Sequence, residues 1–391
     1  MSTRVPTRDK PTWVSYFQVT SYGWFIFGFG PCLQFLREDL FLSGTLTSLH
    51  SVAMALGAVL VGSTSSRVIP KIGRGKFLRL ASYSLVIGLV LFTGGQALAV
   101  TLLGVAFIAA GGAAGVQGTG AYLNNHQGLA APAAITELNA LAAGVGLLAP
   151  VFIGLGYSLG FGWRPGILIA GIMAIGVELF RGKDLNRYGP PVGDIEQSHH
   201  HDLSGKLPRS FNWALVVLIC TAGTEFSMLL FGSELLRVQG QLTKGASAIA
   251  LACIVGGMFL GRLYGSRLAT KMDPESLYRG VLIWSLVGFM IFWLAQNPTL
   301  MILALVFTGC GMSLHWPFGI ARAVRASSGR PDRATARVSV GTGIASGAAP
   351  FALGALSDHV GVHNAYVIVP ILLVIAITIS IFKRVPALVS L

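Results

Sequence analysis

The chain has 391 residues, of which 53% are hydrophobic, with a net charge of +13 and a mean hydropathy of +0.69. Charged residues make up only 11% of it, against about 25% in an average soluble domain. This composition excludes a soluble enzyme, a disordered chain and a secreted disulfide scaffold, and it is typical of a helical protein with many membrane spans.

Twelve apolar segments are long enough to cross a bilayer as helices, which requires roughly 20 residues each. The first begins at residue 13, is longer than the core of a signal peptide and lacks a cleavage site, so we expect it to remain as a span. We therefore expect an all-α membrane protein. The approximate cores of the spans are 13–35, 45–65, 78–97, 100–122, 135–158, 163–180, 213–236, 246–266, 278–296, 299–320, 338–356 and 364–382.

The basic residues are distributed unevenly between the two ends of these spans. If the N-terminus lies in the cytoplasm, only four of the 28 Lys and Arg residues fall in outer connectors, namely Arg37, Arg164, Arg237 and Lys244. This asymmetry predicts a multi-pass protein of the cell membrane with both termini in the cytoplasm. It also accounts for the net charge, so no nucleic-acid partner is expected.

The longest polar stretch, residues 181–211, separates six spans from six. We expect a cytoplasmic linker there, between an N-terminal six-helix bundle (1–180) and a C-terminal six-helix bundle (212–391). The stretch contains His199, His200 and His201. Three adjacent histidines could bind a metal ion, but we interpret them as part of a polar loop and expect no metal site.

The two halves of the chain repeat each other at a constant offset of 200 residues. One offset that holds across five spans predicts two parallel six-helix repeats, related by an axis along the membrane normal. The matched pairs include Gly23 and Gly223, Arg37 and Arg237, Gly57 and Gly257, Lys71 and Lys271, Arg79 and Arg279, and Pro150 and Pro350.

Twelve spans in two repeats, with both ends and a central loop inside, resemble the major facilitator superfamily over nearly the whole chain. A local match follows the second span, where that superfamily usually has G-x-x-x-D-R-x-G-R-(K/R). Here the matching residues are Gly62, Ser66 and Arg67 and then, after a longer spacer, Gly73 and Arg74. The resemblance implies a conformational motif at these residues. In the superfamily its acid belongs to a charge relay that holds the outward-open state, and here serine replaces that acid.

Glu225 is the ionisable residue that lies deepest in a predicted span. A charge at bilayer depth costs several kcal/mol unless it is paired or hydrated, so such a residue is a functional candidate. A carboxylate there could bind and release the proton of a proton-coupled carrier, or it could be a hydrogen-bonded group that only holds helices together. His50 and His315 are further candidates because histidine titrates near neutral pH, although a packing role is equally open for both.

Arg262 lies in the eighth predicted span. In placement it resembles the arginine with which monocarboxylate and oxalate carriers of the superfamily hold a carboxylate, and a guanidinium suits that contact. The alternative is an arginine that reaches to the inner membrane surface. Polar and aromatic residues of other spans could line a central cavity, or could only bond neighbouring helices; these are Tyr22, Trp24, Gln34, Gln117, Asn139 and Thr221.

No ATPase, hydrolase or metalloprotease motif is present, so we expect neither an enzyme nor a bound cofactor. We expect a monomeric secondary active transporter that moves a small molecule by alternating access, driven by the proton gradient. An apolar interior with one embedded acid favours efflux, by antiport, of an amphipathic or cationic compound. Two alternatives are proton-linked uptake of an organic anion through Arg262 and, from another class, a membrane sensor or scaffold that transports nothing.

Overall fold

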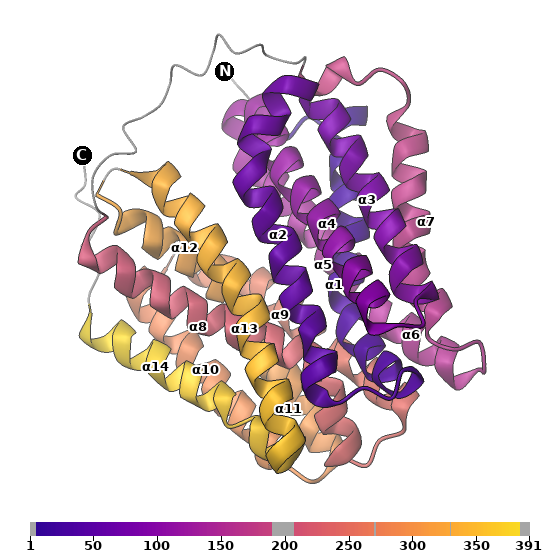
Figure 1. Cartoon of the computed structure of the whole chain (residues 1–391). Coiled ribbons are helices and arrows are strands. Elements are labelled where there is room, and N and C mark those ends of the chain that lie inside the picture. Colours follow the sequence, from indigo (N-terminus) through magenta and orange to yellow (C-terminus); the bar gives the residue numbers. More distant parts are fainter. Residues whose placement is uncertain (1–4, 190–206, 270, 329, 384–391) are drawn as a thin grey trace. The chain divides into compact units, whose positions relative to one another are not determined.

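The computed structural model describes residues 5–189, 207–269, 271–328 and 330–383 (Figure 1). Within these ranges the chain forms fourteen α-helices, two short 3-10 helices and no strand. The α-helices are α1 (Lys10–Asp39), α2 (Gly44–Ile72), α3 (Arg74–Gly94), α4 (Leu98–Gln127), α5 (Ala131–Gly146), α6 (Leu148–Ser158), α7 (Arg164–Arg181), α8 (Arg209–Val238), α9 (Lys244–Ala269), α10 (Pro274–Leu294), α11 (Pro298–Met312), α12 (His315–Arg325), α13 (Pro331–Ala365) and α14 (Ile368–Phe382).

The fourteen helices correspond to the twelve predicted spans, because two of the spans are interrupted. The fifth is divided into α5 and α6 at Leu147, and the tenth into α11 and α12 after Met312. Each break lies just before a proline, Pro150 or Pro317, which has no N–H to donate to the carbonyl four residues earlier. The predicted fold of twelve transmembrane helices is confirmed, and the continuous spans predicted at 135–158 and 299–320 are each two helices.

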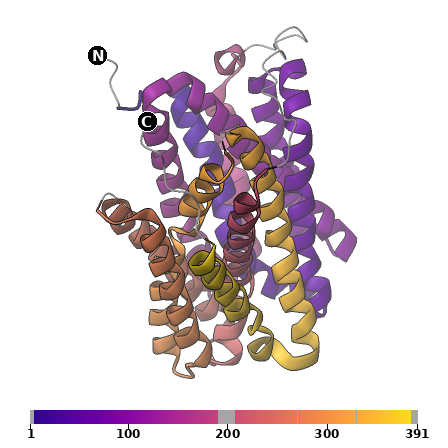
Figure 2. The same ribbon diagram turned by 90° about the vertical axis from the view of Figure 1, so that its left-hand side faces the viewer.

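Length and composition alone identify eight segments of the described chain as able to cross a membrane, and one of them, Leu98–Ser158, contains two crossings. The other three predicted spans correspond to α1, α7 and α14, which do not meet these criteria of length and composition; α14 has only 15 residues. In both halves neighbouring helices pack along their lengths, as α3 packs on α4 and α10 on α11 (Figure 2).

The internal repeat is visible in the backbone. Helices α3 and α10 each have 21 residues and begin 200 positions apart. Phe41 and Gln241, also 200 apart, both have φ of 52°, a value that is uncommon for residues other than glycine. Gly128 and Ser328 form a second such pair, with φ of 52° and 51°. The predicted pseudo-symmetry therefore holds down to single residues.

Two glycines of the repeat occupy equivalent close contacts between helices. A Cβ at Gly57 of α2 would collide with the carbonyl oxygen of Ala106 in α4, and a Cβ at Gly257 of α9 with that of Val306 in α11. Small residues at such positions let membrane helices approach each other closely. The high glycine content thus has a packing function in both halves.

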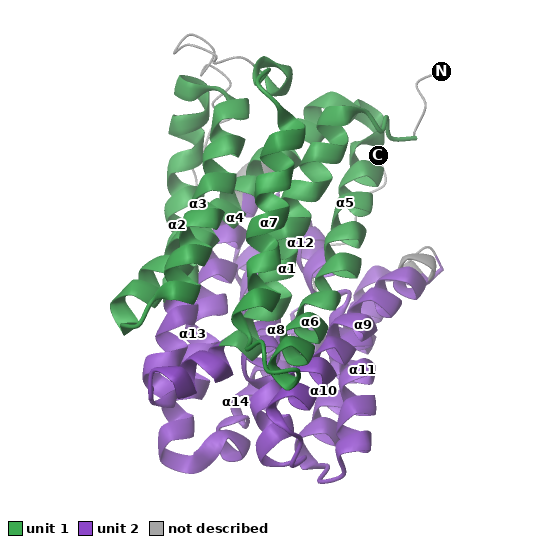
Figure 3. Cartoon of the chain, turned by 90° about the vertical axis from the view of Figure 1, so that its right-hand side faces the viewer, with its two compact units in different colours: residues 1–32, 53–201 green, residues 33–52, 202–391 purple. Residues whose placement is uncertain are grey.

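The chain forms two compact units (Figure 3). Unit 1 contains residues 1–32 and 53–201, and unit 2 contains residues 33–52 and 202–391. The end of α1 and the beginning of α2 therefore belong to unit 2, while the rest of both helices belongs to unit 1. The halves predicted from the sequence, with boundaries at 180 and 212, remain a prediction.

The predicted linker and its histidines are described only in part. Residues 190–206, which include His199, His200 and His201, lie outside the described ranges. Among the residues that the structure does describe, no group of three or more His, Cys, Asp or Glu side chains is placed to hold a metal ion.

Candidate functional site

Glu225 and Arg262 are two embedded charges of opposite sign in unit 2. Glu225 lies on α8. In the most apolar 18-residue stretch of this helix 72% of the residues are buried inside the protein, against 44–56% for the other described helices that are long and apolar enough to cross a membrane. Both side chains are half-buried, and within the described ranges neither forms an ion pair or a hydrogen bond. The guanidinium of Arg262, on α9, is the charged group that acts on the Glu225 carboxylate through space. The two charges therefore influence each other without direct contact.

Unsatisfied hydroxyl groups flank Glu225 on α8. Thr224 and Ser227 are fully buried, and their hydroxyl oxygens have no hydrogen-bond partner in the described part of the chain. Thr221, one turn earlier, is also buried but donates to the carbonyl of Leu218 at 3.0 Å. Thr221 was among the residues predicted from the sequence, whereas Thr224 and Ser227 were not, because they lie one position before and two positions after Glu225 and so do not share its helix face by spacing.

The two candidate histidines are buried and bonded within unit 2. His50 is fully buried, and its Nδ1 lies 2.8 Å from the carbonyl oxygen of Thr47. His315 is 1% exposed, and its Nε2 lies 3.0 Å from the hydroxyl of Ser285. The Nδ1 of His315 has no partner among the described residues. These contacts favour the packing role that the sequence left open for both, and the coupling role remains a prediction.

The cavity candidates of unit 1 differ in their surroundings. Trp24 is 3% exposed and donates its indole N–H to the carbonyl of Gly166 at 2.9 Å, so it joins α1 to α7. Tyr22 is half-buried with its ring against α4. Gln117 is half-buried and accepts a hydrogen bond from a serine of α2 at 3.0 Å. Asn139 is exposed and bonds to its own helix.

Gln34 is part of a charged cavity of unit 2 that the sequence did not predict. The cavity measures about 260 Å³. Arg37 pairs with Glu234 at 2.6 Å, and Arg237 pairs with Glu38 at 3.0 Å. The side-chain nitrogen of Gln34 is buried there without a described partner. The sequence matched Arg37 with Arg237, but not with the acids that the fold brings to them.

Asp358 of α13 binds the N-terminus of α2. Its carboxylate accepts hydrogen bonds from the backbone N–H groups of Gly44 and Thr45 at 2.6 and 2.8 Å, and from the Thr45 hydroxyl at 2.6 Å. These N–H groups lie in the first turn of α2, where backbone N–H groups have no hydrogen-bond acceptor within the helix. A Cβ at Gly44 would lie 2.7 Å from the carbonyl oxygen of Gly354, so the two helices are in close contact. Ion pairs and this cap together attach residues 33–52 to unit 2.

The conformational motif lies at the other end of α2, in unit 1. Gly62, Ser66 and Arg67 are exposed on α2. Gly73 has φ of 81° and separates α2 from α3. Arg74, the first residue of α3, is half-buried, and its Nε has no hydrogen-bond partner in the described chain.

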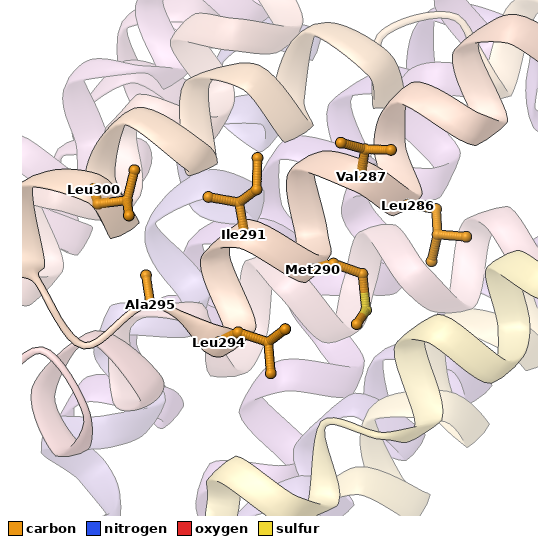
Figure 4. A pocket seen from close by; sticks show the side chains of 7 residues that line it. All are labelled: Leu286, Val287, Met290, Ile291, Leu294, Ala295 and Leu300. Atoms are coloured by element: carbon orange, nitrogen blue, oxygen red, sulfur yellow. The ribbon is translucent and has the colours of Figure 1, made fainter.

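An apolar hollow of about 550 Å³ lies on α10 and α11 (Figure 4). Among the described residues, no charged or hydrogen-bonding side chain lines it, so these residues offer nothing to orient a polar substrate. Its lining residues are Leu286, Val287, Met290, Ile291, Leu294, Ala295 and Leu300.

Comparison with known proteins gives a family match over part of the chain and a fold over nearly all of it. The family model described as Major Facilitator Superfamily matches residues 214–390. A search of curated proteins finds no match.

Among solved structures, a POT family transporter in complex with 5-aminolevulinic acid is 14% identical, with 97% of this chain and 98% of that chain covered and a TM-score of 0.78. A D-xylose-proton symporter is 13% identical, with 96% and 98% covered and a TM-score of 0.77. A bacterial homolog of the human lysosomal transporter Spinster is 15% identical, with 96% and 97% covered and a TM-score of 0.74. At these identities the likeness shows a shared fold over nearly the whole chain.

Proposed function

We propose that this chain is a membrane transporter of the Major Facilitator Superfamily rather than an enzyme, and that it moves a small molecule by alternating access, coupled to protons through Glu225. The observation that carries this proposal is the embedded pair of Glu225 and Arg262, both half-buried and not in direct contact. A proton gradient is then the only energy source required, with no cofactor.

The pair gives a simple coupling mechanism. When Glu225 is ionised, its charge offsets that of Arg262 across the space between them. When Glu225 takes up a proton, Arg262 is left as an uncompensated cation. Proton binding at Glu225 and anion binding at Arg262 therefore favour each other, and by thermodynamic linkage the effect is reciprocal. Such linkage is what a proton symporter needs.

This arrangement changes the preferred substrate class. The sequence favoured efflux of an amphipathic or cationic compound, but a cation placed beside Glu225 would be repelled by Arg262. We therefore place proton-linked transport of an organic anion first. Two proteins of the same fold support the parts of this proposal: one is a D-xylose-proton symporter, and another was crystallised with 5-aminolevulinic acid, a carboxylate-bearing molecule.

Efflux of an amphipathic or cationic compound remains the second candidate function, because the Glu225 carboxylate has no ion-pair partner in the described chain. The two candidates differ in what Arg262 does. Purified protein in liposomes with a pH-sensitive dye inside would be supplied with monocarboxylates, lipophilic cations, sugars and amino acids. The anion function is supported if monocarboxylates produce proton flux, and if this flux is abolished by Arg262→Gln and partly retained by Arg262→Lys. Proton flux with lipophilic cations that Arg262→Gln leaves intact supports efflux.

We also propose that the protein functions as a monomer in the cell membrane with both termini in the cytoplasm. The distribution of Lys and Arg supports this orientation. Residues 33–52, at the outer ends of α1 and α2, would then lie outside. Because the rest of α1 and α2 belongs to unit 1, we infer that movement of unit 1 during alternating access must break the bonds of residues 33–52 or bend both helices.

A further inference from the structure

Residues 63–76 comprise the end of α2, Gly73 and the beginning of α3, and are called here the α2–α3 turn. This segment carries four basic residues and no acid. Three of them, Arg67, Lys71 and Lys76, are exposed. None of these three forms an ion pair with any residue that the structure describes. The fourth, Arg74, is half-buried with an unbonded Nε. The turn is therefore a concentrated, uncompensated positive surface in unit 1.

The helix that follows the turn adds to this charge. Helix α3 begins after Gly73, and no side chain caps its N-terminus. The first N–H groups of a helix have no partner within it, and the helix dipole gives that end a partial positive charge. Both features favour an anion at the turn.

The equivalent turn in unit 2 is balanced by acids. At the positions of Gly73 and Gly75 the second half has Asp273 and Glu275. Asp273 accepts a hydrogen bond from the first turn of α10 at 2.8 Å, and Glu275 pairs with two arginines of α12 at 2.9 and 3.1 Å. Gly75 has no room for a side chain, because a Cβ there would collide with the carbonyl oxygen of Leu185. Of the two equivalent turns, only the α2–α3 turn therefore lacks acidic residues.

Exposed apolar side chains continue from the turn along both helices. Leu60 on α2 is 62% exposed, and Leu80 on α3 is 55% exposed. In membrane-spanning helices such side chains meet lipid chains. A ligand that matches both surfaces carries an anionic group at one end and hydrocarbon at the other, which is the chemistry of an anionic phospholipid and not of a soluble phosphate.

We propose that the α2–α3 turn binds an anionic phospholipid, with the phosphate against Arg67, Lys71 and Lys76 and the acyl chains along Leu60 and Leu80. With the N-terminus in the cytoplasm, the lipid comes from the inner leaflet. The proposal does not depend on Glu225 or on the transported substrate, since lipid binding is measured on the resting protein.

The repeat supplies a matched control for the test. The variant Arg67→Gln/Lys71→Gln removes two charges from the basic turn, and Arg267→Gln/Lys271→Gln removes the two residues 200 positions later. Full-length protein in detergent would be titrated with phosphatidylglycerol or with phosphatidylcholine of the same acyl chains, and bound lipids counted by native mass spectrometry. Circular dichroism melts would verify that both variants are folded.

Each basic side chain near an anionic lipid contributes about a fivefold gain in binding, so the first variant should bind phosphatidylglycerol about 30-fold more weakly. The control variant should bind it as the wild type does, and phosphatidylcholine should bind all three proteins equally. Equal losses in both variants, or no preference for phosphatidylglycerol in the wild type, would overturn the proposal. So would displacement of bound phosphatidylglycerol by an equal concentration of inorganic phosphate, which would indicate a site for soluble anions.

Discussion

The charged cap on α2 leads to the sharpest mechanical prediction. In the Asp358→Asn variant the negative charge is lost, together with one of the two oxygens that now accept hydrogen bonds from Gly44 and Thr45. A hydrogen bond to a charged group contributes about 1.5–3 kcal/mol, and the Asp358 side chain is 22% exposed, which favours the lower part of that range. We therefore expect the free energy that holds the N-terminus of α2 against α13 to fall by about 2 kcal/mol. The fraction of molecules in which this end of α2 is detached should then rise about 30-fold.

The assay is labelling of Leu42→Cys, a residue that lines the charged cavity, in a background without the native cysteines. A membrane-impermeant maleimide should react with this cysteine about 30-fold faster when Asp358→Asn is also present. Asp273→Asn is the control, because Asp273 also caps a helix N-terminus but bonds only within its own turn. Equal labelling rates in the wild type and in Asp358→Asn would refute the view that this cap holds residues 33–52 in place.

Three further substitutions test the packing by thermal melting in detergent. Trp24→Phe should lower the free energy of unfolding by about 1–2 kcal/mol, because it removes a buried hydrogen bond from α1 to a carbonyl of α7; an unchanged melting temperature would contradict this. Gly57→Ala should lower the free energy of unfolding by about 2–3 kcal/mol, because the added methyl group would collide with the backbone of α4. Gly144→Ala, with open space around its Cβ, should be neutral or slightly stabilising, and equal effects of the two alanines would show that the close contact at α4 has been misassigned.

The fold was largely predictable because its main signals are local. A membrane helix must satisfy its backbone internally and face lipid, so each span appears as an apolar run of sufficient length. The offset of 200 residues predicted the repeat, and the positive φ angles of Phe41 and Gln241 agree with it. The break after Met312 was missed, although Pro317 marks it in the sequence, and the break at Leu147 lies just before Pro150.

The candidate site was predictable only in its charged members. Glu225 and Arg262 stand out because each interrupts an apolar run, which is a local signal. Thr224 and Ser227 give no such signal, since hydroxyl groups in helices are usually bonded to their own backbone. The cap formed by Asp358 depends on a partner 314 positions away, which no local pattern can indicate.

The central claim is that Glu225 carries the proton, and comparison of uphill with exchange transport tests it most directly. Once the dye assay has identified a substrate, liposomes with an imposed pH gradient would be used to measure accumulation, and liposomes without a gradient would be used to measure exchange of labelled for unlabelled substrate. We predict that Glu225→Gln abolishes accumulation and retains exchange, because the amide can neither bind nor release a proton, while Glu225→Asp retains both. Full gradient-driven accumulation by Glu225→Gln would contradict the claim.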